Sequence, residues 1–357
     1  MITLNQHKAA FYKRILAIFS DDSAPKMGLG AWFKKETTRD KAVSIEVERN
    51  RQLMAVDVQR NTGGNVNSFS NHTEKMYIPP YFEELFDFTQ VQYYDVTFGE
   101  QNNPTQSQAR SMINEASRRL MTLKHKIQRA IEQQRAQVLQ TGIVTLINGD
   151  NIDYKRKAAS KSALTGTDVW SNAAGKPLDD LANGIKFIRQ EGKSASREFD
   201  LILGAAAFAS FMENTQVKNK ADLRRISVVN IGTPMFDNTT GLAYHGQVST
   251  QNGTVNLWTY DDFYETAGGS YLPYIEDKNV VLLPRDFRGC QAYAGVPAIK
   301  RDKSNAEYPA FIQQVEADFY MNNYLDEKKK AHWFEINSAP LAVPVSVDRV
   351  WSLQVEE

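Results

Sequence analysis

Histidine and cysteine side chains supply many nucleophiles and metal ligands, and in this sequence they are few and scattered. None of the histidines stands in an HExxH or similar metal-ligand spacing; they are His7, His72, His125, His245 and His332. The single cysteine, Cys290, excludes an intramolecular disulfide and a zinc site built from several thiolates. We therefore expect neither a metal site nor any other cofactor.

The glycine-rich motifs that bind phosphate groups are also missing. The sequence contains no GxGxxG, GxxxxGK[ST] or GxSxG pattern. Gly63 and Gly64 lie in a segment rich in Asn and Ser, and no helical pattern follows them. We interpret this pair as a turn and not as a phosphate-binding loop.

Two places in the sequence have residue types that could take part in catalysis or bind a metal. Cys290 follows Arg288, and a positive neighbour lowers the pKa of a thiol toward its nucleophilic form. Asp261, Asp262 and Glu265 form an acidic cluster of the kind that serves general acid or metal chemistry. A lone thiol after a buried strand is more often a small packing residue, and acidic clusters are common on solvated loops. We therefore expect no catalytic residue at either place.

A long helix is predicted over 107–140, because apolar residues recur there at steps of three and four and Gly142 follows as a stop. At 1.5 Å per residue it is about 50 Å long, so we expect a strut along a surface. Its charge is unbalanced: Arg110, Arg118, Arg119, Lys124, Lys126, Arg129 and Arg135 stand against Glu115 and Glu132. A solvated polar face is the simpler interpretation, and contact with nucleic acid or an acidic partner is the alternative.

Strand periodicity begins at Val43. Apolar and polar residues alternate over 43–48 and 54–59, 60–72 is rich in Asn, Ser, Gly and Thr, and apolar residues return just before Pro79. This pattern predicts a long two-stranded excursion with a polar tip. A hairpin alone is marginally stable in water, so we expect this one to lean on another copy of the chain.

The remaining elements follow from turn residues and apolar runs. Asn148-Gly149 and Asn252-Gly253 predict two hairpins that stand out from the body. The most aromatic segment, 81–98, is expected in the core at the root of the excursion. Further elements are expected as a helix over 8–19, helices over 178–190 and 205–214, buried strands over 199–203 and 280–283, and a strand-like stretch over 310–321.

Composition narrows the class of protein. The 357 residues are 42% hydrophobic and 11% aromatic, which excludes a wholly disordered or collagen-like chain. Forty-two basic residues balance forty-two acidic ones, which argues against a generally cationic nucleic-acid binder. No run approaches the roughly 20 apolar residues that span a bilayer, and the run at 15–19 is too short for a secretory signal. We expect a protein made and kept in a cytoplasm.

The order of these parts resembles the major capsid proteins of tailed bacteriophages. Within that group the sequence is most similar to the lambda-type family called phage major capsid protein E. The stretches that carry the resemblance are Gly63-Gly64 with Ser68-Phe69, Asp222 to Arg225, Tyr308-Pro309, and Ile336 to Leu341. The likeness covers roughly residues 35 to 355, and the section 241–274 is longer or differently built than the family suggests.

The resemblance implies an α+β architecture, the Hong Kong 97-type capsid fold. The parts it implies are an N-terminal arm at 1–42, an extended β loop at 43–80, a peripheral domain at 81–222 that includes the spine helix 107–140, an axial domain at 223–335, and a C-terminal strand at 336–357 that returns to the peripheral domain.

The resemblance also implies a structural function. Many copies would close as hexamers and pentamers into an icosahedral head that encloses double-stranded DNA, assembled in the host cytoplasm and retained in the virion. The implied partners are other copies, a separate scaffolding protein, a portal, packaged DNA through non-specific contact, and a decoration protein as an optional partner, with no membrane. The residues expected at the interface between copies are Val56, Val58, Arg60, Gly63, Gly64, Phe69, Met76 and Tyr77.

Two alternatives stay open from the sequence. An encapsulin-like bacterial shell has the same fold and encloses a protein cargo, and the Ser-Ala-Pro-Leu stretch at 338–341 favours the phage family over it. The other alternative is a cytoplasmic enzyme or ligand-binding protein with an acidic site near Asp261, Asp262 and Glu265. The enzyme would be a monomer or small oligomer, whereas both shell proteins would form particles.

Overall fold

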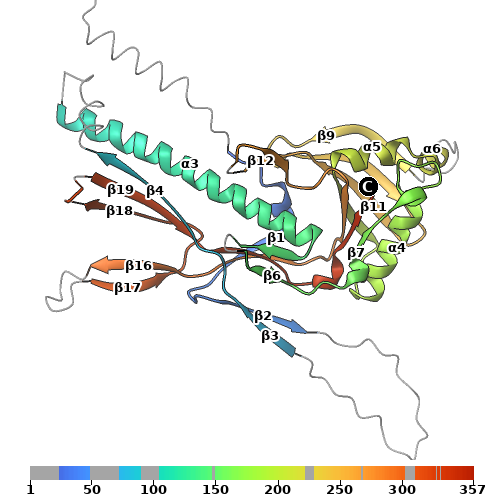
Figure 1. The fold of residues 1–357 in the computed structure, drawn as a ribbon, viewed down its shortest axis with the longest axis horizontal. Coiled ribbons are helices and arrows are strands. Elements are labelled where there is room, and N and C mark those ends of the chain that lie inside the picture. The colour runs from blue at the N-terminus through green and yellow to red at the C-terminus, as the bar shows by residue number, and fades with distance from the viewer. Residues whose placement is uncertain are drawn as a thin grey trace, which may run out of the picture.

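A computed structural model gives the fold of the chain. It describes residues 24–48, 72–89, 104–146, 149–221, 229–266, 268–301, 310–326, 328–329 and 331–357. The molecule is elongated: a long helix and narrow sheets form one end, and a larger sheet covered by shorter helices forms the other (Figure 1). A two-stranded hairpin leaves the middle of the body (Figure 1).

The larger end is a mixed sheet of seven strands. Their order across the sheet is β7 (Lys161–Ala163), β21 (Trp351–Gln354), β14 (Asn279–Pro284), β8 (Glu198–Leu203), β11 (Thr254–Tyr260), β10 (Leu242–Ser249) and β9 (Val229–Phe236). Apolar side chains alternate between its two faces: Leu201 packs with the short helices, whereas Ile202 belongs to the core under the long helix. The short helices are α4 (Pro177–Gln190), α5 (Ala205–Glu213) and α6 (Thr215–Ala221).

The long helix, α3 (Pro104–Gln140), has 37 residues and confirms the predicted strut, beginning three residues earlier than expected. It ends where Gly142 adopts a φ of 73°, a conformation that glycine reaches without strain. Beyond the end, Arg156 donates to the carbonyl oxygens of Leu139 and Gln140 at 2.8 and 3.3 Å. These donors satisfy carbonyl groups that have no partner within the helix.

A three-stranded antiparallel sheet packs against the N-terminal part of α3 that lies away from the larger sheet (Figure 1). Its strands are β4 (Phe82–Thr89), β19 (Ala331–Ser338) and β18 (Tyr320–Asp326), with β19 in the centre. The face toward α3 is aromatic: Phe86 stacks on Phe334 at 5.2 Å between ring centroids, and Phe88 is 3% exposed. Phe88 therefore meets the expectation of an aromatic core, whereas Tyr81 and Leu85 are exposed and the expectation is wrong for them. Residues 90–98 fall outside the described residues.

A second three-stranded sheet lies under the C-terminal half of α3. Its strands, in order, are β1 (Phe33–Thr37), β15 (Gly289–Tyr293) and β20 (Pro340–Pro344). A short 3-10 helix, η1 (Gly28–Trp32), precedes β1, and Leu29 is fully buried in the main core. The predicted arm 1–42 is therefore wrong for 24–37, which are part of the body; the predicted helix 8–19 lies outside the described residues.

The remaining strands form two-stranded ribbons. The predicted excursion is seen as β2 (Val43–Glu48) paired with β3 (His72–Tyr77), and its second predicted strand, 54–59, lies outside the described residues. The stretch 310–321 is divided between two strands, β17 (Ala310–Val315) and β18. The other ribbons are β5 (Ile143–Thr145) with β6 (Asn151–Asp153), β12 (Phe263–Glu265) with β13 (Tyr271–Pro273), and β16 (Val296–Arg301) with β17 (Ala310–Val315).

Three further 3-10 helices lie in the connections between these elements. They are η2 (Ala158–Ser160), η3 (Gly166–Asp168) and η4 (Val347–Arg349).

Two expectations about this arrangement are wrong. The hairpins marked by Asn-Gly do not stand clear of the body, because Val144 is fully buried in the core and β10–β11 is internal to the seven-stranded sheet. The boundary expected between residues 222 and 223 runs through that same sheet, since β8 precedes it in sequence and β9 follows it. Turn residues and chain order alone do not reveal which strands pair across a long connection.

Candidate subunit interface

The β2–β3 hairpin is anchored to the body at its root. Tyr77, the last residue of β3, packs against Tyr154 with 5.3 Å between ring centroids. The Tyr154 hydroxyl donates to the carbonyl oxygen of Ala342 in β20 at 2.7 Å, and Tyr154 is 4% exposed. Val43, at the start of β2, also packs against this core. The hairpin therefore leaves the molecule from a fixed point on the β1–β15–β20 sheet.

Two of the eight residues expected at the interface are described. Tyr77 is half-buried within its own chain, whereas Met76 is 70% exposed on the neighbouring position of β3. Two positions further along the chain, Ile78 is 61% exposed. The other six predicted residues lie outside the described residues: Val56, Val58, Arg60, Gly63, Gly64 and Phe69. The structure thus gives the hairpin root an apolar surface next to a buried anchor.

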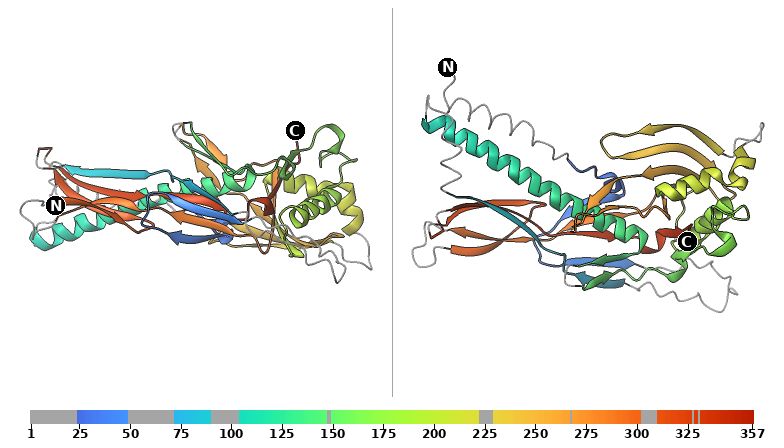
Figure 2. Two further views of the ribbon diagram at one scale, coloured as in Figure 1. Left: turned by 90° about the horizontal axis from the view of Figure 1, so that it is seen from below. Right: turned by 45° about the horizontal axis from the view of Figure 1, so that its top comes forward.

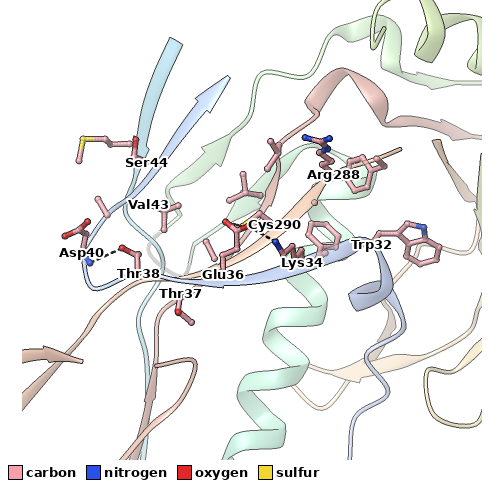
Figure 3. A pocket seen from close by; sticks show the side chains of 18 of the residues that line it. Trp32, Lys34, Glu36, Thr37, Thr38, Asp40, Val43, Ser44, Arg288 and Cys290 are labelled. Carbon is pink, nitrogen blue, oxygen red and sulfur yellow. Dashed lines mark hydrogen bonds and ion pairs between the residues drawn. The ribbon is translucent and has the colours of Figure 1, made fainter. Parts of the chain in front are cut away.

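A groove of about 1310 Å³ runs between the hairpin root and the β1–β15–β20 sheet (Figure 3). Strand register places Lys34, Cys290 and Val343 side by side across its floor. The lining also includes Val43, Ser44 and Met76 from the hairpin root, and Phe287, Arg288 and Val345 from the segments next to β15 and β20. Figure 3 shows Glu36 and Cys290 together on the floor, with Arg288 on the side away from Val43. Sequence patterning did not indicate this groove, since it arises where chain segments far apart in sequence meet.

A buried polar cluster fixes the segment before β1 to α3. Glu132 is fully buried and accepts from the backbone N–H of Leu29 at 2.7 Å and from Arg135 at 2.9 Å. The Tyr260 hydroxyl lies 3.0 Å from the same carboxylate. Arg135 also donates to Gln291 of β15 at 3.0 Å. Burial raises the pKa of Glu132, and the Arg135 charge and these hydrogen bonds oppose that rise.

Strand β1 is also held at the surface by charged contacts. Lys35 donates to Asp318 at 2.6 Å, and Thr37 donates to Glu316 at 2.8 Å. Both acceptors lie between β17 and β18, so these contacts tie the N-terminal strand to the far part of the chain. The sequence hints at the buried Glu132–Arg135 pair through its spacing of three residues on one helix, but its contact with Leu29 depends on the fold.

The basic side chains of α3 are largely used within the chain. Lys126 pairs with Glu84 at 2.7 Å, and Arg135 with Glu132. The Arg119 guanidinium lies 4.6 Å from the Phe88 ring centroid, and Lys124 lies over Phe319. Several of the basic side chains that give this helix its excess positive charge therefore make contacts within the chain. They do not form a surface that is fully open to a polyanion such as DNA.

At the two places with a chemical interpretation, the structure raises the pKa of a side chain. Burial and the nearby Glu36 carboxylate raise the pKa of Cys290 to about 12, so the thiol lacks the lowered pKa that a positive neighbour such as Arg288 can give. The Cys290 sulfur lies 3.6 Å from Glu36 Oε2. Burial also raises the pKa of Asp262, which Lys26 opposes. Within the described ranges, no group of three His, Cys, Asp or Glu side chains is arranged to hold a metal, and no helix is long and apolar enough to cross a membrane.

Comparison with known families decides between these interpretations. The model of the family phage major capsid protein E matches residues 24–355, nearly the whole chain. The chain belongs to the phage major capsid protein E family. It is thus a capsid protein of the phage type, a virion component that assembles with copies of itself, and the family match favours this over an encapsulin or an enzyme. No curated protein sequence matches the chain.

One solved structure shows the fold, and two further shell-protein structures are similar at lower scores. A putative capsid protein of a prophage from Escherichia coli CFT073 matches with a TM-score of 0.58 at 15% identity, covering 96% of this chain and 98% of that one. The capsid of the cyanophage P-SCSP1u matches at 0.45 and 11% identity, covering 94% and 90%. The SrpI encapsulin of Synechococcus elongatus PCC 7942 matches at 0.47 and 10% identity, covering 97% and 95%. The α+β architecture is that of the Hong Kong 97-type capsid fold, as predicted.

Proposed function

We propose that copies of this chain form hexamers and pentamers that close into an icosahedral head around double-stranded DNA, and that the β2–β3 hairpin and the chain beyond it make the contacts between copies. The observation that supports this most directly is the hairpin root, where Tyr77 anchors an element whose neighbouring residues Met76 and Ile78 expose apolar surface. Large apolar side chains exposed side by side are typical of surfaces that a partner covers.

In this proposal the two ends of the molecule correspond to two different domains of the capsid fold. The seven-stranded sheet with α4, α5 and α6 is the axial domain, and α3 with β4, β18 and β19 is the peripheral domain. This division replaces the sequence-based boundary at 222 and 223 by one that follows strand pairing. The C-terminal segment supplies β20 to the sheet under α3 and β21 to the seven-stranded sheet, so it links the two domains.

The proposed partners are a separate scaffolding protein during assembly in the host cytoplasm, a portal, an optional decoration protein, and packaged DNA through non-specific contact. Without the scaffold, we expect tubes, sheets or irregular shells more readily than uniform heads. The chain has equal numbers of acidic and basic residues, which suits a wall around DNA that must later be released. We also propose that no residue of the chain is catalytic.

Removal of residues 60–72 tests the role of the hairpin. The truncated chain should remain folded and soluble and build few or no closed particles in electron micrographs. A second variant, in which the same residues are replaced by an equal length of Gly and Ser, keeps the length of the loop and loses its side chains. Normal particles from both variants would contradict the proposed contact.

A further inference from the structure

The β12–β13 ribbon presents aromatic side chains to solvent on the face turned away from the body. Side chains alternate along β12: Tyr264 packs against the core under α3, so Phe263 and Glu265 lie on the opposite face. Strand register adds Tyr271 and Pro273 to that outer face, because they pair with Glu265 and Phe263. Phe263 is 51% exposed and Tyr271 is 70% exposed. The outer face of the ribbon is therefore largely apolar and open to solvent.

The turn between β9 and β10 lies beside the start of this ribbon. Its Gly241 donates from the backbone N–H to the carbonyl oxygen of Asp237 at 2.8 Å. A Cβ built at Gly241 would stand 3.4 Å from Oδ2 of Asp262, the residue before β12. Phe236, which precedes Asp237, is 73% exposed and adds a third aromatic side chain at this edge of the molecule. We name these three residues the ribbon patch: Phe236, Phe263 and Tyr271.

Hydrogen bonds at both ends hold the ribbon in place. At its base the side-chain amide of Gln133 on α3 donates to the hydroxyl of Tyr264 at 3.1 Å. At its tip the backbone N–H of Thr266 donates to the carbonyl oxygen of Ser270 at 2.8 Å. A ribbon fixed in this way loses little conformational entropy when a partner binds its outer face.

Acidic groups surround the ribbon patch. The sequence over 236–273 contains no Lys or Arg and four acidic residues: Asp237, Asp261, Asp262 and Glu265. The Thr240 hydroxyl and the Thr239 N–H donate to Asp237 at 2.7 and 2.8 Å, and both hydrogen bonds lower the pKa of that carboxyl. Lys26 lies beside Asp262 and offsets part of the negative charge. The charge that remains repels nucleic acid and favours a partner with basic side chains.

The area of the ribbon patch limits the kind of occupant. An aromatic side chain buries roughly 150 to 250 Å² when it is fully covered. With 51 to 73% of each side chain exposed, the patch offers a partner roughly 300 to 500 Å². A stable interface between two folded proteins buries about 800 Å² on each partner. The patch therefore suits a short apolar segment better than the face of a second folded subunit.

We propose that the ribbon patch binds a basic amphipathic segment of a different protein during assembly. Apolar side chains of the segment cover the patch, and its Lys or Arg side chains face the surrounding carboxylates. The inference rests on the proposed function, because a capsid subunit meets separate proteins as its shell assembles, and it goes further by naming the surface and the chemistry of the segment. In Figure 1 the ribbon lies across α3 from the β2–β3 hairpin, which is proposed to make the contacts between copies. Its position therefore favours a different protein over a second copy.

A synthetic peptide tests the site on dissociated full-length subunits. The probe is a fluorescent peptide of about 14 residues, with Leu at helical spacing and Lys at the other positions. One control peptide has Glu in place of Lys, and another has the same Leu and Lys residues in an order without an apolar face. Fluorescence anisotropy at low salt should show the probe binding about tenfold or more tightly than either control. Equal affinities for the three peptides would overturn the proposal.

Variants at exposed positions locate the binding of this probe. Phe263→Ser combined with Tyr271→Ser should weaken the binding about tenfold or more, because it removes most of the apolar area. Asp261→Asn combined with Glu265→Gln should weaken it less and reduce its dependence on salt. Tyr324→Ser is the matched control, since Tyr324 is an aromatic residue of β18 that is 44% exposed. Equal losses in the control and in the Phe263 and Tyr271 variant would contradict the proposed site.

A photocrosslinker in place of Phe263 distinguishes a different protein from a second copy. The variant carries p-benzoylphenylalanine at that position and is assembled from equal amounts of ¹⁴N- and ¹⁵N-labelled chains. After irradiation we expect no crosslink from this position between a light and a heavy chain. On dissociated subunits we expect a crosslink to the basic probe peptide. Crosslinks between light and heavy chains would show that a second copy covers the patch and would overturn the proposal.

The outcomes separate this inference from the function on which it rests. The peptide measurement uses dissociated subunits, so its result does not depend on the formation of shells. Subunits that assemble normally but do not select the basic amphipathic peptide contradict the ribbon patch alone. A chain that never assembles under any condition contradicts the proposed function, and with it the role of the patch in assembly.

Discussion

At the scale of single residues, the most informative side chains are polar groups that the fold has buried. Glu132 on α3 joins the backbone of Leu29, the side chain of Arg135 and the hydroxyl of Tyr260. Leu29 and Tyr260 are far from Glu132 in the sequence, whereas Arg135 lies three residues further along the same helix. The cluster thereby holds the segment before β1 against the long helix, and it replaces the hydration that a buried carboxylate loses.

Removal of the Glu132 carboxylate should therefore be costly. In Glu132→Ala the Arg135 guanidinium, 7% exposed, loses its ion pair, and we expect the free energy of unfolding to fall by about 3 to 5 kcal/mol. The measurement is urea unfolding of dissociated subunits. Glu198→Ala is the matched control, because Glu198 pairs with Arg285 at 2.8 Å on the exposed surface. That change should cost less than about 1 kcal/mol, and equal losses in the two variants would contradict the account.

Cys290 gives a prediction on pH dependence. Burial and the Glu36 carboxylate raise its pKa to about 12, so the thiol stays protonated where an ordinary cysteine has ionised. The alkylation rate with iodoacetamide on folded subunits should keep rising about tenfold per pH unit from pH 8 to 10, since only the thiolate reacts. Glu36→Gln removes one of the two causes and should raise the rate at pH 9. A plateau near pH 9 in the native subunit would show an unperturbed thiol.

At the scale of elements, local sequence signals and long-range pairing contribute differently. The long helix, the buried strands near 199–203 and 280–283, and the hairpin root near 43 were predicted because each depends on periodicity within a few turns or residues. The sheet order was not, because β8 pairs with both β11 and β14 across long connections. The groove escaped prediction for the same reason: its floor joins residues near 34, 290 and 343.

The end of α3 is an element whose sequence signal can be tested. Gly142 has a positive φ, and a Cβ built there would stand 2.4 Å from Cδ of Arg156, the residue that caps the helix. Gly142→Ala should lower the free energy of unfolding by about 2 kcal/mol or more, through backbone strain and displacement of that cap. Gly149→Ala is the control, because Gly149 also has a positive φ but no neighbour within 4 Å. It should cost about 1 kcal/mol, and an equal cost at both positions would leave Arg156 without its proposed role.

At the scale of the whole molecule, the shape and the exposed apolar surface of the chain are typical of a subunit of a larger assembly. A hairpin extends from its middle, and its long helix carries a narrow sheet far from the larger core (Figure 2). Apolar side chains such as Met76 remain exposed. An isolated soluble monomer gains little from such a shape, because exposed ribbons bury few apolar groups. A shell of many copies covers these surfaces, in agreement with membership of the phage major capsid protein E family.

The most direct test of this account is electron microscopy of the purified full-length chain, over a range of protein and salt concentrations and with its own scaffolding protein where that is identified. We predict closed heads with the scaffold, and curved sheets, tubes or irregular shells without it, in which each copy contacts several others. A chain that stays monomeric or forms only small discrete oligomers under all these conditions would contradict the assignment as a shell subunit.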